Sequence, residues 1–268
     1  MSKIVIVTGA SSGIGNSIAT LLCKYNFTVY GTCRNPKDYK NSFDFQLLSL
    51  DISNEKSIHL FINKIKNKHK KIDVLINNAG QGITGAVEET SINKLRENFE
   101  TNFFGPLKLI QLILPIMRKN NFGKIINITS IGGYMGLPYR GGYSSSKGAF
   151  SLISESLRME VKKFNIEVST IAPGDFKTDI ASRRYHTPLN KGSIYSKEYE
   201  KSLELMNLDI YKGKDPILVA YKVINIINNK NPKVHYVLGS FLEKLSIFLK
   251  FILPQKIFEK LIMIHYKL

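Results

Sequence analysis

Short runs of β-branched and apolar residues alternate with longer segments of helical periodicity over most of this chain. The runs that we expect to be strands are Ile4–Val7, Thr28–Thr32, Phe45–Leu48, Val74–Ile76, Lys124–Ile128, Val168–Ile171 and Val234–Val237. Most of them are continuously apolar, which is typical of strands with helices on both faces. The alternation therefore predicts an α/β fold with a doubly wound parallel sheet.

The chain of 268 residues fits a single domain, because no repeat, low-complexity linker or Pro/Gly/Ser-rich boundary divides it. We assign residues 1–240 to this domain. Within it, residues 180–214 form a polar, turn-rich segment that precedes a helix predicted to begin near Asp215.

Residues 241–268 form a tail in which apolar side chains fall on one helical face and lysines interrupt every apolar run. The apolar residues are Leu242, Leu245, Leu249 and Ile252. No run is long enough to span a membrane, so we predict an amphipathic helical extension. We favour its packing on the domain or on a second subunit. The alternative is peripheral membrane contact, with the lysines toward anionic headgroups.

The chain carries 38 basic and 21 acidic side chains, a formal net charge of +17, and 43% of its residues are hydrophobic. This apolar fraction excludes a disordered polycation. The excess charge comes from 31 lysines rather than from the 7 arginines, and arginine is the residue on which nucleic-acid recognition usually depends. We therefore expect a solvated lysine surface and no nucleic-acid partner.

Two cysteines, Cys23 and Cys33, are too few for a disulfide framework, and the first strand follows Met1 too closely for a signal peptide. Both features indicate a cytoplasmic protein. We expect no metal, because the histidines are scattered without the spacing of metal ligands. They are His59, His69, His186, His235 and His265.

A glycine-rich turn, Thr8–Gly15, joins the first predicted strand to the first helix. Glycines let backbone N–H groups approach a pyrophosphate, and the helix N-terminus adds partial positive charge. The spacing of the glycines differs from GxGxxG, so it is the position after a strand that favours dinucleotide binding over a plain tight turn. The residues that we expect to bind are Gly9, Ser11, Ser12, Gly13, Ile14 and Gly15.

The next predicted strands end in residues suited to the rest of a dinucleotide. Arg34 stands where an acidic residue would bind the adenosine ribose, and an arginine there favours a 2′-phosphate. We therefore expect NADP(H) rather than NAD(H). Asp51 would accept from the adenine amino group or serve as a carboxylate at a helix N-terminus, and both alternatives stay open. The other expected cofactor residues are Asn35, Ile52, Asn78, Ala79 and Gly80.

The strongest local constellation follows the fifth predicted strand. Ser130 comes directly after this strand, and Tyr143 and Lys147 are four residues apart, one turn apart on one helical face. An ammonium beside a phenol favours the phenolate, which prepares a tyrosine to exchange a proton at neutral pH. A Tyr/Lys pair alone, however, is more often a helix-surface contact.

Together the motifs resemble the short-chain dehydrogenase/reductase family, in its shorter single-domain branch, over roughly residues 1–240. The motifs are Thr8–Gly15, Asn77–Gly80, Asn102, Ser130, Tyr143, Lys147 and Pro173-Gly174, in the family's order and spacing. The resemblance implies a Rossmann-like domain and an oxidoreductase that transfers a hydride between a nicotinamide and an alcohol or ketone.

The resemblance also implies a role for each matching residue. Tyr143 would be the general acid/base for the substrate oxygen, and Ser130 would hold that oxygen. Lys147 would bind the nicotinamide ribose and favour the tyrosinate. Asn102 would anchor a water in the proton relay. The residues that match the segment beside the nicotinamide are Pro173, Gly174 and Thr178, the last of which would contact the carboxamide.

In the family's layout, residues 131–139 would face the substrate, and residues 180–214 stand in the place of the substrate-binding loop. The apolar residues of the first segment are Tyr134, Met135, Leu137 and Tyr139. We therefore expect a bulky, apolar steroid-, retinoid- or lipid-like small molecule and a homodimer or homotetramer. The alternatives are a 3-oxoacyl-carrier-protein reductase, whose acidic carrier suits a basic surface, and a catalytically silent cofactor-binding protein associated with membranes.

Overall fold

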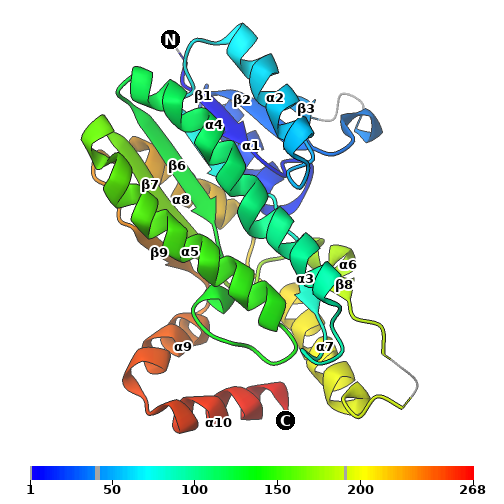
Figure 1. Cartoon of the computed structure of the whole chain (residues 1–268). Coiled ribbons are helices and arrows are strands. Elements are labelled where there is room, and N and C mark those ends of the chain that lie inside the picture. Colours follow the sequence, from blue (N-terminus) through cyan, green and yellow to red (C-terminus); the bar gives the residue numbers. More distant parts are fainter. Residues whose placement is uncertain (1, 40–42, 190–191) are drawn as a thin grey trace.

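The computed structural model describes residues 2–39, 43–189 and 192–268, and it places seven strands in one parallel sheet (Figure 1). Their spatial order is β3-β2-β1-β4-β6-β7-β9, so the winding reverses between β1 and β4. The strands are β1 (Ile4–Val7), β2 (Thr28–Cys33), β3 (Gln46–Ser49), β4 (Val74–Asn77), β6 (Gly123–Ile128), β7 (Ile166–Pro173) and β9 (His235–Leu238). The predicted doubly wound sheet is confirmed, and each predicted strand differs only at its ends.

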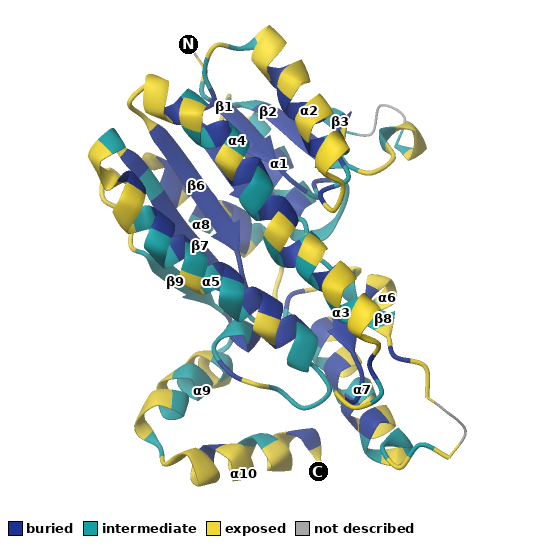
Figure 2. Cartoon of the chain, in the orientation of Figure 1, coloured by how far each residue is buried: buried dark blue, intermediate teal, exposed yellow. Residues whose placement is uncertain are grey.

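Helices cover both faces of the sheet, and burial is concentrated between the layers (Figure 2). The main helices are α1 (Gly13–Lys24), α2 (Glu55–Lys68), α4 (Gly105–Lys119), α5 (Gly141–Val161) and α8 (Ile217–Asn228). Side chains of β1 alternate between two cores, because successive strand residues point to opposite faces. Ile4 and Ile6 pack with residues of α2, α4 and α5, whereas Val5 and Val7 pack with residues of α1 and α8.

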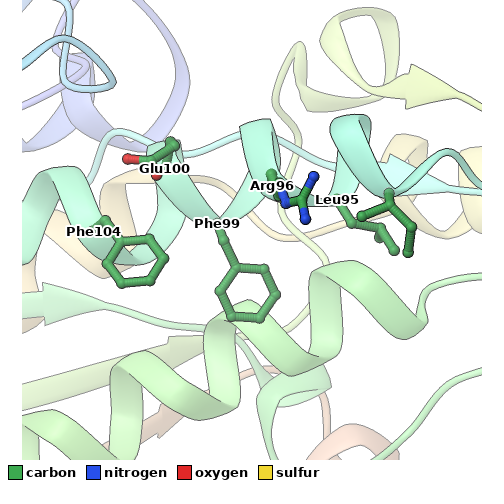
Figure 3. A pocket seen from close by; sticks show the side chains of 6 residues that line it. Leu95, Arg96, Phe99, Glu100 and Phe104 are labelled. Atoms are coloured by element: carbon green, nitrogen blue, oxygen red, sulfur yellow. The ribbon is translucent and has the colours of Figure 1, made fainter.

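Shorter elements complete the domain. They are η1 (Pro36–Asp38), β5 (Ile83–Thr84), α3 (Ile92–Phe99), the π-helical turn η2 (Glu100–Phe104), η3 (Ile131–Gly133), η4 (Lys162–Phe164), α6 (Ile180–Arg183), β8 (Tyr185–His186) and α7 (Ser196–Tyr211). Strands β5 and β8 pair in parallel as a second small sheet that the sequence did not predict. A surface hollow of about 370 Å³ lies along α3 and η2. Figure 3 shows side chains that line it, Phe99 and Phe104 among them.

The prediction that residues 180–214 are turn-rich is wrong for the second half of this segment, where α7 forms. Tyr199, Ser202, Met206 and Ile210 recur at helical spacing and are buried. The lysines and glutamates between them conceal the pattern in the sequence. Of this segment, residues 190–191 lie outside the described part of the chain. The helix predicted near Asp215 is confirmed as α8.

The tail folds as two helices, α9 (Phe241–Ile252) and α10 (Gln255–Tyr266), which Figure 1 shows in orange and red beside the carboxyl end of the sheet. A capping box begins α9: Ser240 Oγ accepts from the Glu243 N–H (3.2 Å), and the Glu243 carboxylate accepts from the Ser240 N–H (2.5 Å). Within the described residues, no helix has both the length and the apolar character needed to cross a bilayer.

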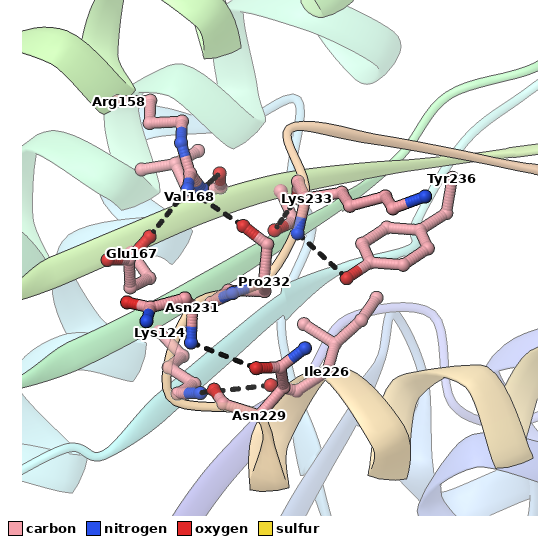
Figure 4. Close-up of polar contacts among 11 residues, drawn as sticks. Lys124, Arg158, Glu167, Val168, Ile226, Asn229, Asn231, Pro232, Lys233 and Tyr236 are labelled. Atoms are coloured by element: carbon pink, nitrogen blue, oxygen red, sulfur yellow. Dashed lines mark hydrogen bonds and ion pairs between the residues drawn. The ribbon is translucent and has the colours of Figure 1, made fainter.

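Polar contacts fasten the opposite end of the sheet, where β6 and β7 begin (Figure 4). The buried Lys124 Nζ donates to the carbonyl oxygens of Ile226 (2.9 Å) and Asn229. Arg158 of α5 forms an ion pair with Glu167 of β7 (2.8 Å). These contacts hold α5 and α8 to the sheet at the end where the strands begin, which is opposite the carboxyl ends of the strands.

Candidate functional site

The carboxyl ends of four parallel strands bring the predicted site residues together. The turn 8–15 follows β1, residues 78–80 follow β4, Ser130 follows β6 and Pro173 ends β7. The winding of the sheet reverses between β1 and β4, and in open α/β sheets such a switch point is where ligands bind.

The glycine-rich turn has no room for side chains at its glycine positions. Gly9 and Gly13 have φ values of +64° and +54°, which glycine adopts without strain. A Cβ on Gly15 would lie 2.2 Å from the Gly9 carbonyl oxygen. Ser11 and Ile14 are half-buried in the same turn. The bare backbone and the N-terminus of α1 fit the pyrophosphate of a dinucleotide.

Two side chains brace this turn from inside the protein. Asn78 Nδ2 donates to the carbonyl oxygens of Thr8 (2.9 Å) and Gly9 (3.1 Å). Thr8 Oγ1 accepts from the backbone N–H groups of Asn78 and Ala79, both at 2.9 Å. The asparagine that we expected to bind cofactor therefore holds the glycine turn in place.

The residues expected at the adenosine end lie after β2 and β3. Arg34 is exposed, and within the described part of the chain it forms no ion pair. Asp51 Oδ1 accepts from the Ser53 N–H (3.0 Å) and hydroxyl (2.7 Å). Asn54, not Asp51, caps α2, so of the two alternatives for Asp51 the helix cap is wrong. The other two residues predicted here are Asn35, which is exposed, and Ile52, which is buried.

Asn102 lies in the π-helical turn η2, an irregularity frequent at functional sites. It is 1% exposed. Its Oδ1 accepts from the Gln81 N–H (2.8 Å), and its Nδ2 donates to the Gln81 carbonyl (2.9 Å) and to Ser146 Oγ (3.0 Å). Ser146 Oγ in turn donates to the Tyr143 carbonyl (2.9 Å). Asn102 thus ties η2 to α5, the helix that carries Tyr143 and Lys147.

Lys147 is buried on α5, one turn after Tyr143. Its Nζ donates to the Ile128 carbonyl (3.0 Å), and among the described residues it makes no second hydrogen bond, so further donors of the ammonium remain for a ligand. Burial lowers the pKa of Lys147, and the adjacent Tyr143 opposes this shift. A Cβ on Gly80 would lie 3.2 Å from both Lys147 Nζ and Asn102 Oδ1. The ammonium and the amide therefore converge on one point beside the turn after β4.

Ser130 and Tyr143 complete the predicted set. Both are buried. Ser130 Oγ accepts from the Gly132 N–H (3.1 Å), so its hydroxyl proton is free to be donated to a substrate oxygen. Ser144, which the sequence did not single out, is also buried, and within the described residues its Oγ has no hydrogen-bond partner.

The segment after β7 folds over the glycine turn. A Cβ on Gly13 would lie 3.2 Å from Thr178 Cγ2, and Arg183 Nη1 donates to Ser12 Oγ (2.6 Å). Thr178 is thereby placed over the cofactor turn. Arg183 belongs to none of the motifs found in the sequence, so its contact with the turn was not predicted.

A charged cluster beside the predicted nicotinamide segment links the site to the tail. Glu243 Oε1 accepts from the Asp175 N–H (2.6 Å), and a Cβ on Gly174 would lie 1.9 Å from this oxygen. Burial raises the pKa of Asp175 to about 6; Glu243 adds to this shift, whereas Arg140 opposes it. Burial also raises the pKa of Tyr266, and again Arg140 opposes the shift. Sequence analysis missed this cluster; only the capping-box spacing of Ser240 and Glu243 gave a signal.

Comparison with known proteins agrees with this geometry. The family described as short chain dehydrogenase matches residues 3–188. A protein of Bacteroides thetaiotaomicron named 3-ketodihydrosphingosine reductase is 36% identical over 98% of each chain. A crystal structure of a short-chain dehydrogenase from Streptomyces avermitilis has a TM-score of 0.78 and 28% identity over 97% of this chain and 98% of that one.

A second solved structure, of ElxO with NADP bound, has a TM-score of 0.71 and 27% identity over 89% of this chain and 96% of that one. The family match, the relative's full-length identity and the shared fold agree with the site geometry. The chain belongs to the short-chain dehydrogenase/reductase family, and it is an oxidoreductase with an NAD(P)-binding fold.

Proposed function

We propose that the chain is an NADP(H)-dependent reductase that acts on a ketone carried by a long-chain, lipid-derived substrate. The observation that carries the proposal is an apolar layer directly beyond Ser130. Ile131, Met135 and Phe258 are buried together there. The half-buried residues packed around them are Tyr134, Leu137, Val237, Ile247, Leu249, Leu253 and Ile262. The apolar segment 131–139 is thereby extended by the tail helices.

An alkyl chain gains free energy by leaving water for such a layer, whereas a polyol would lose hydrogen bonds to water. A relative whose name specifies a ketone on a long-chain lipid supports the same substrate class. The apolar wall on its own does not distinguish lipids from steroids; the relative favours lipids.

The proposed mechanism assigns one task to each residue. When bound, the nicotinamide supplies the hydride. The Ser130 hydroxyl donates a hydrogen bond to the carbonyl oxygen, and the Tyr143 hydroxyl passes its proton to that oxygen as the alcohol forms. The Lys147 ammonium stabilises the resulting phenolate, and its free donors suit the ribose hydroxyls. Asn102 holds η2 against α5 and anchors the water that returns a proton.

A series of 3-ketolipids tests the substrate class. With NADPH, we expect kcat/KM to rise roughly threefold to fourfold per added methylene, because each buried CH₂ contributes about 0.8 kcal/mol, until the chain outgrows the apolar layer. The series includes 3-ketodihydrosphingosine, and the comparison substrates are a short 3-oxoacyl thioester on an acidic carrier protein and a ketose. A flat response to chain length, or a preference for the carrier-bound thioester, would refute the proposal.

Arg34 tests the choice of cofactor. Arg34→Ala is expected to lower the ratio of kcat/KM with NADPH to kcat/KM with NADH by roughly 10- to 100-fold, because hydrogen bonds to a charged group contribute about 1.5–3 kcal/mol. Steady-state kinetics with both cofactors measure the ratio. Arg118→Ala on α4, which removes the same charge elsewhere, is the control. An unchanged ratio in Arg34→Ala contradicts the role of Arg34.

A further inference from the structure

The last helix of the chain presents a row of exposed apolar side chains. Ile257, Leu261 and Ile264 of α10 recur at i, i+4 and i+7, which places them on one face. They are 51%, 44% and 62% exposed.

Helix α9 adds a second exposed apolar face. Phe241, Phe248, Phe251 and Ile252 are all exposed, and within α9 no residue is fully buried. Figure 2 shows that exposed residues cover most of α10, whereas along α9 they alternate with half-buried ones. An exposed apolar face on each of two successive helices, flanked by polar residues, is typical of an interaction site.

These faces are not the result of an undocked tail, because the opposite faces hold the helices in place. Phe258 and Tyr266 of α10 are buried. Glu243 of α9 accepts from the Asp175 backbone. Lys250 Nζ lies 5.3 Å from the centre of the Phe258 ring and joins α9 to α10. The exposed faces therefore remain free after the tail has packed on the domain.

The charges around the apolar row favour an anionic occupant. Lys256 and Lys260 each precede a residue of the row, so both lie along one flank of it. Residues 241–268 contain five lysines and two glutamates, and one glutamate, Glu243, is turned inward as a helix cap. A second copy of this tail would bring lysine against lysine, whereas anionic lipid headgroups complement them.

We propose that α9 and α10 lie in the plane of an anionic lipid bilayer, with their exposed apolar faces in the acyl boundary and the lysines toward the headgroups. Helix α9 also contacts η3, the turn that follows Ser130. The contact surface is therefore adjacent to the substrate side of the site. A lipid-derived substrate could then enter the site from the bilayer, a consequence that rests on the proposed function. The binding of the tail to the bilayer does not rest on it.

The absence of tryptophan from the chain allows a direct test. In the full-length protein, Phe251→Trp introduces a single indole into the proposed contact face. With phosphatidylglycerol vesicles, its emission is expected to shift to the blue, and brominated acyl chains are expected to quench it. Tyr25→Trp, at the end of α1 and far from the tail, is the matched control and is expected to stay unchanged. No substrate or cofactor is needed, so the result is independent of the proposed function.

Two further variants separate the apolar and electrostatic contributions. Lys256→Gln combined with Lys260→Gln is expected to weaken partitioning to phosphatidylglycerol vesicles roughly 10- to 30-fold, since each lysine near the surface contributes about 1 kcal/mol. Lys64→Gln combined with Lys66→Gln on α2, with the same change of net charge, is expected to retain most of the binding. Ile257→Ser combined with Ile264→Ser is expected to abolish partitioning, whereas Leu60→Ser combined with Leu152→Ser is not.

The opposite results overturn the proposal. Wild-type protein that does not partition to anionic vesicles, or tail variants that partition as well as wild type, would exclude a bilayer as the occupant. If Ile257→Ser with Ile264→Ser instead halves the molar mass measured by light scattering while vesicles have no effect, the occupant is a second copy of the chain.

Discussion

Tyr143→Phe is expected to lower kcat/KM for ketone reduction by about 10³-fold, within the range of 10²- to 10⁴-fold that positioned general acids contribute. Tyr143 lies one turn before the buried Lys147 on α5, and an ammonium beside a phenol favours loss of the phenol proton. Single-turnover oxidation of NADPH measures the loss of the chemical step itself.

The structure predicts what this substitution leaves intact. The ring of Tyr143 keeps its place under the Arg140 guanidinium, which lies 5.1 Å from the ring centre. The Ser146 hydroxyl donates to the backbone carbonyl of Tyr143, which the substitution leaves unchanged. NADPH affinity and the free energy of unfolding are therefore expected to change little. Tyr221→Phe, at an exposed position on α8, is the control and retains activity. Full activity in Tyr143→Phe would show that another group supplies the proton.

The sheet could be predicted because its strands are buried on both faces and so appear in the sequence as continuous apolar runs. Val5 and Val7 face one core, and Ile4 and Ile6 face the other. Local pattern and tertiary environment agree at these residues. Helix α7 was missed because its buried side chains, such as Tyr199 and Met206, alternate with charged residues whose exposure only the tertiary structure reveals.

The placement of most expected cofactor residues and of Ser130 was predictable because these residues follow strands, and parallel strands end at one edge of the sheet. The pairing of Tyr143 with Lys147 was predictable from their helical spacing, since both lie on α5. Contacts between distant segments were not. The bond between the Asp175 backbone and Glu243 spans 68 positions in the sequence, and no local pattern specifies such a contact. The same holds for Arg183, which reaches Ser12 from the segment after β7. The sequence also left open which faces of the tail are buried, because Leu242 and Leu245 share one periodicity but differ in exposure.

Lys147→Met is expected to lower kcat/KM by roughly 10²-fold or more, because no cation then stabilises the phenolate that forms as Tyr143 gives up its proton. The pH profile of the residual activity is expected to move toward alkaline pH for the same reason. The KM for cofactor is expected to rise as well, since the ammonium donors that suit the ribose are lost. Steady-state kinetics over a pH series measure all three effects.

Lys147→Met is expected to affect stability differently from activity, because the free energy of unfolding should not fall. Burial lowers the pKa of Lys147 in the folded protein, so below that pKa its desolvated charge opposes folding, and stability rises with pH between the folded and unfolded values. Lys147→Met removes this charge and fills the same volume, although it also leaves the Ile128 carbonyl without its donor. We therefore expect a free energy of unfolding at neutral pH that is equal to or above that of wild type, measured by urea denaturation.

Lys162→Met, at the exposed end of the same helix, is the control and is expected to change neither kcat/KM nor the free energy of unfolding. Activity lost together with a large loss of stability would instead assign Lys147 a structural role.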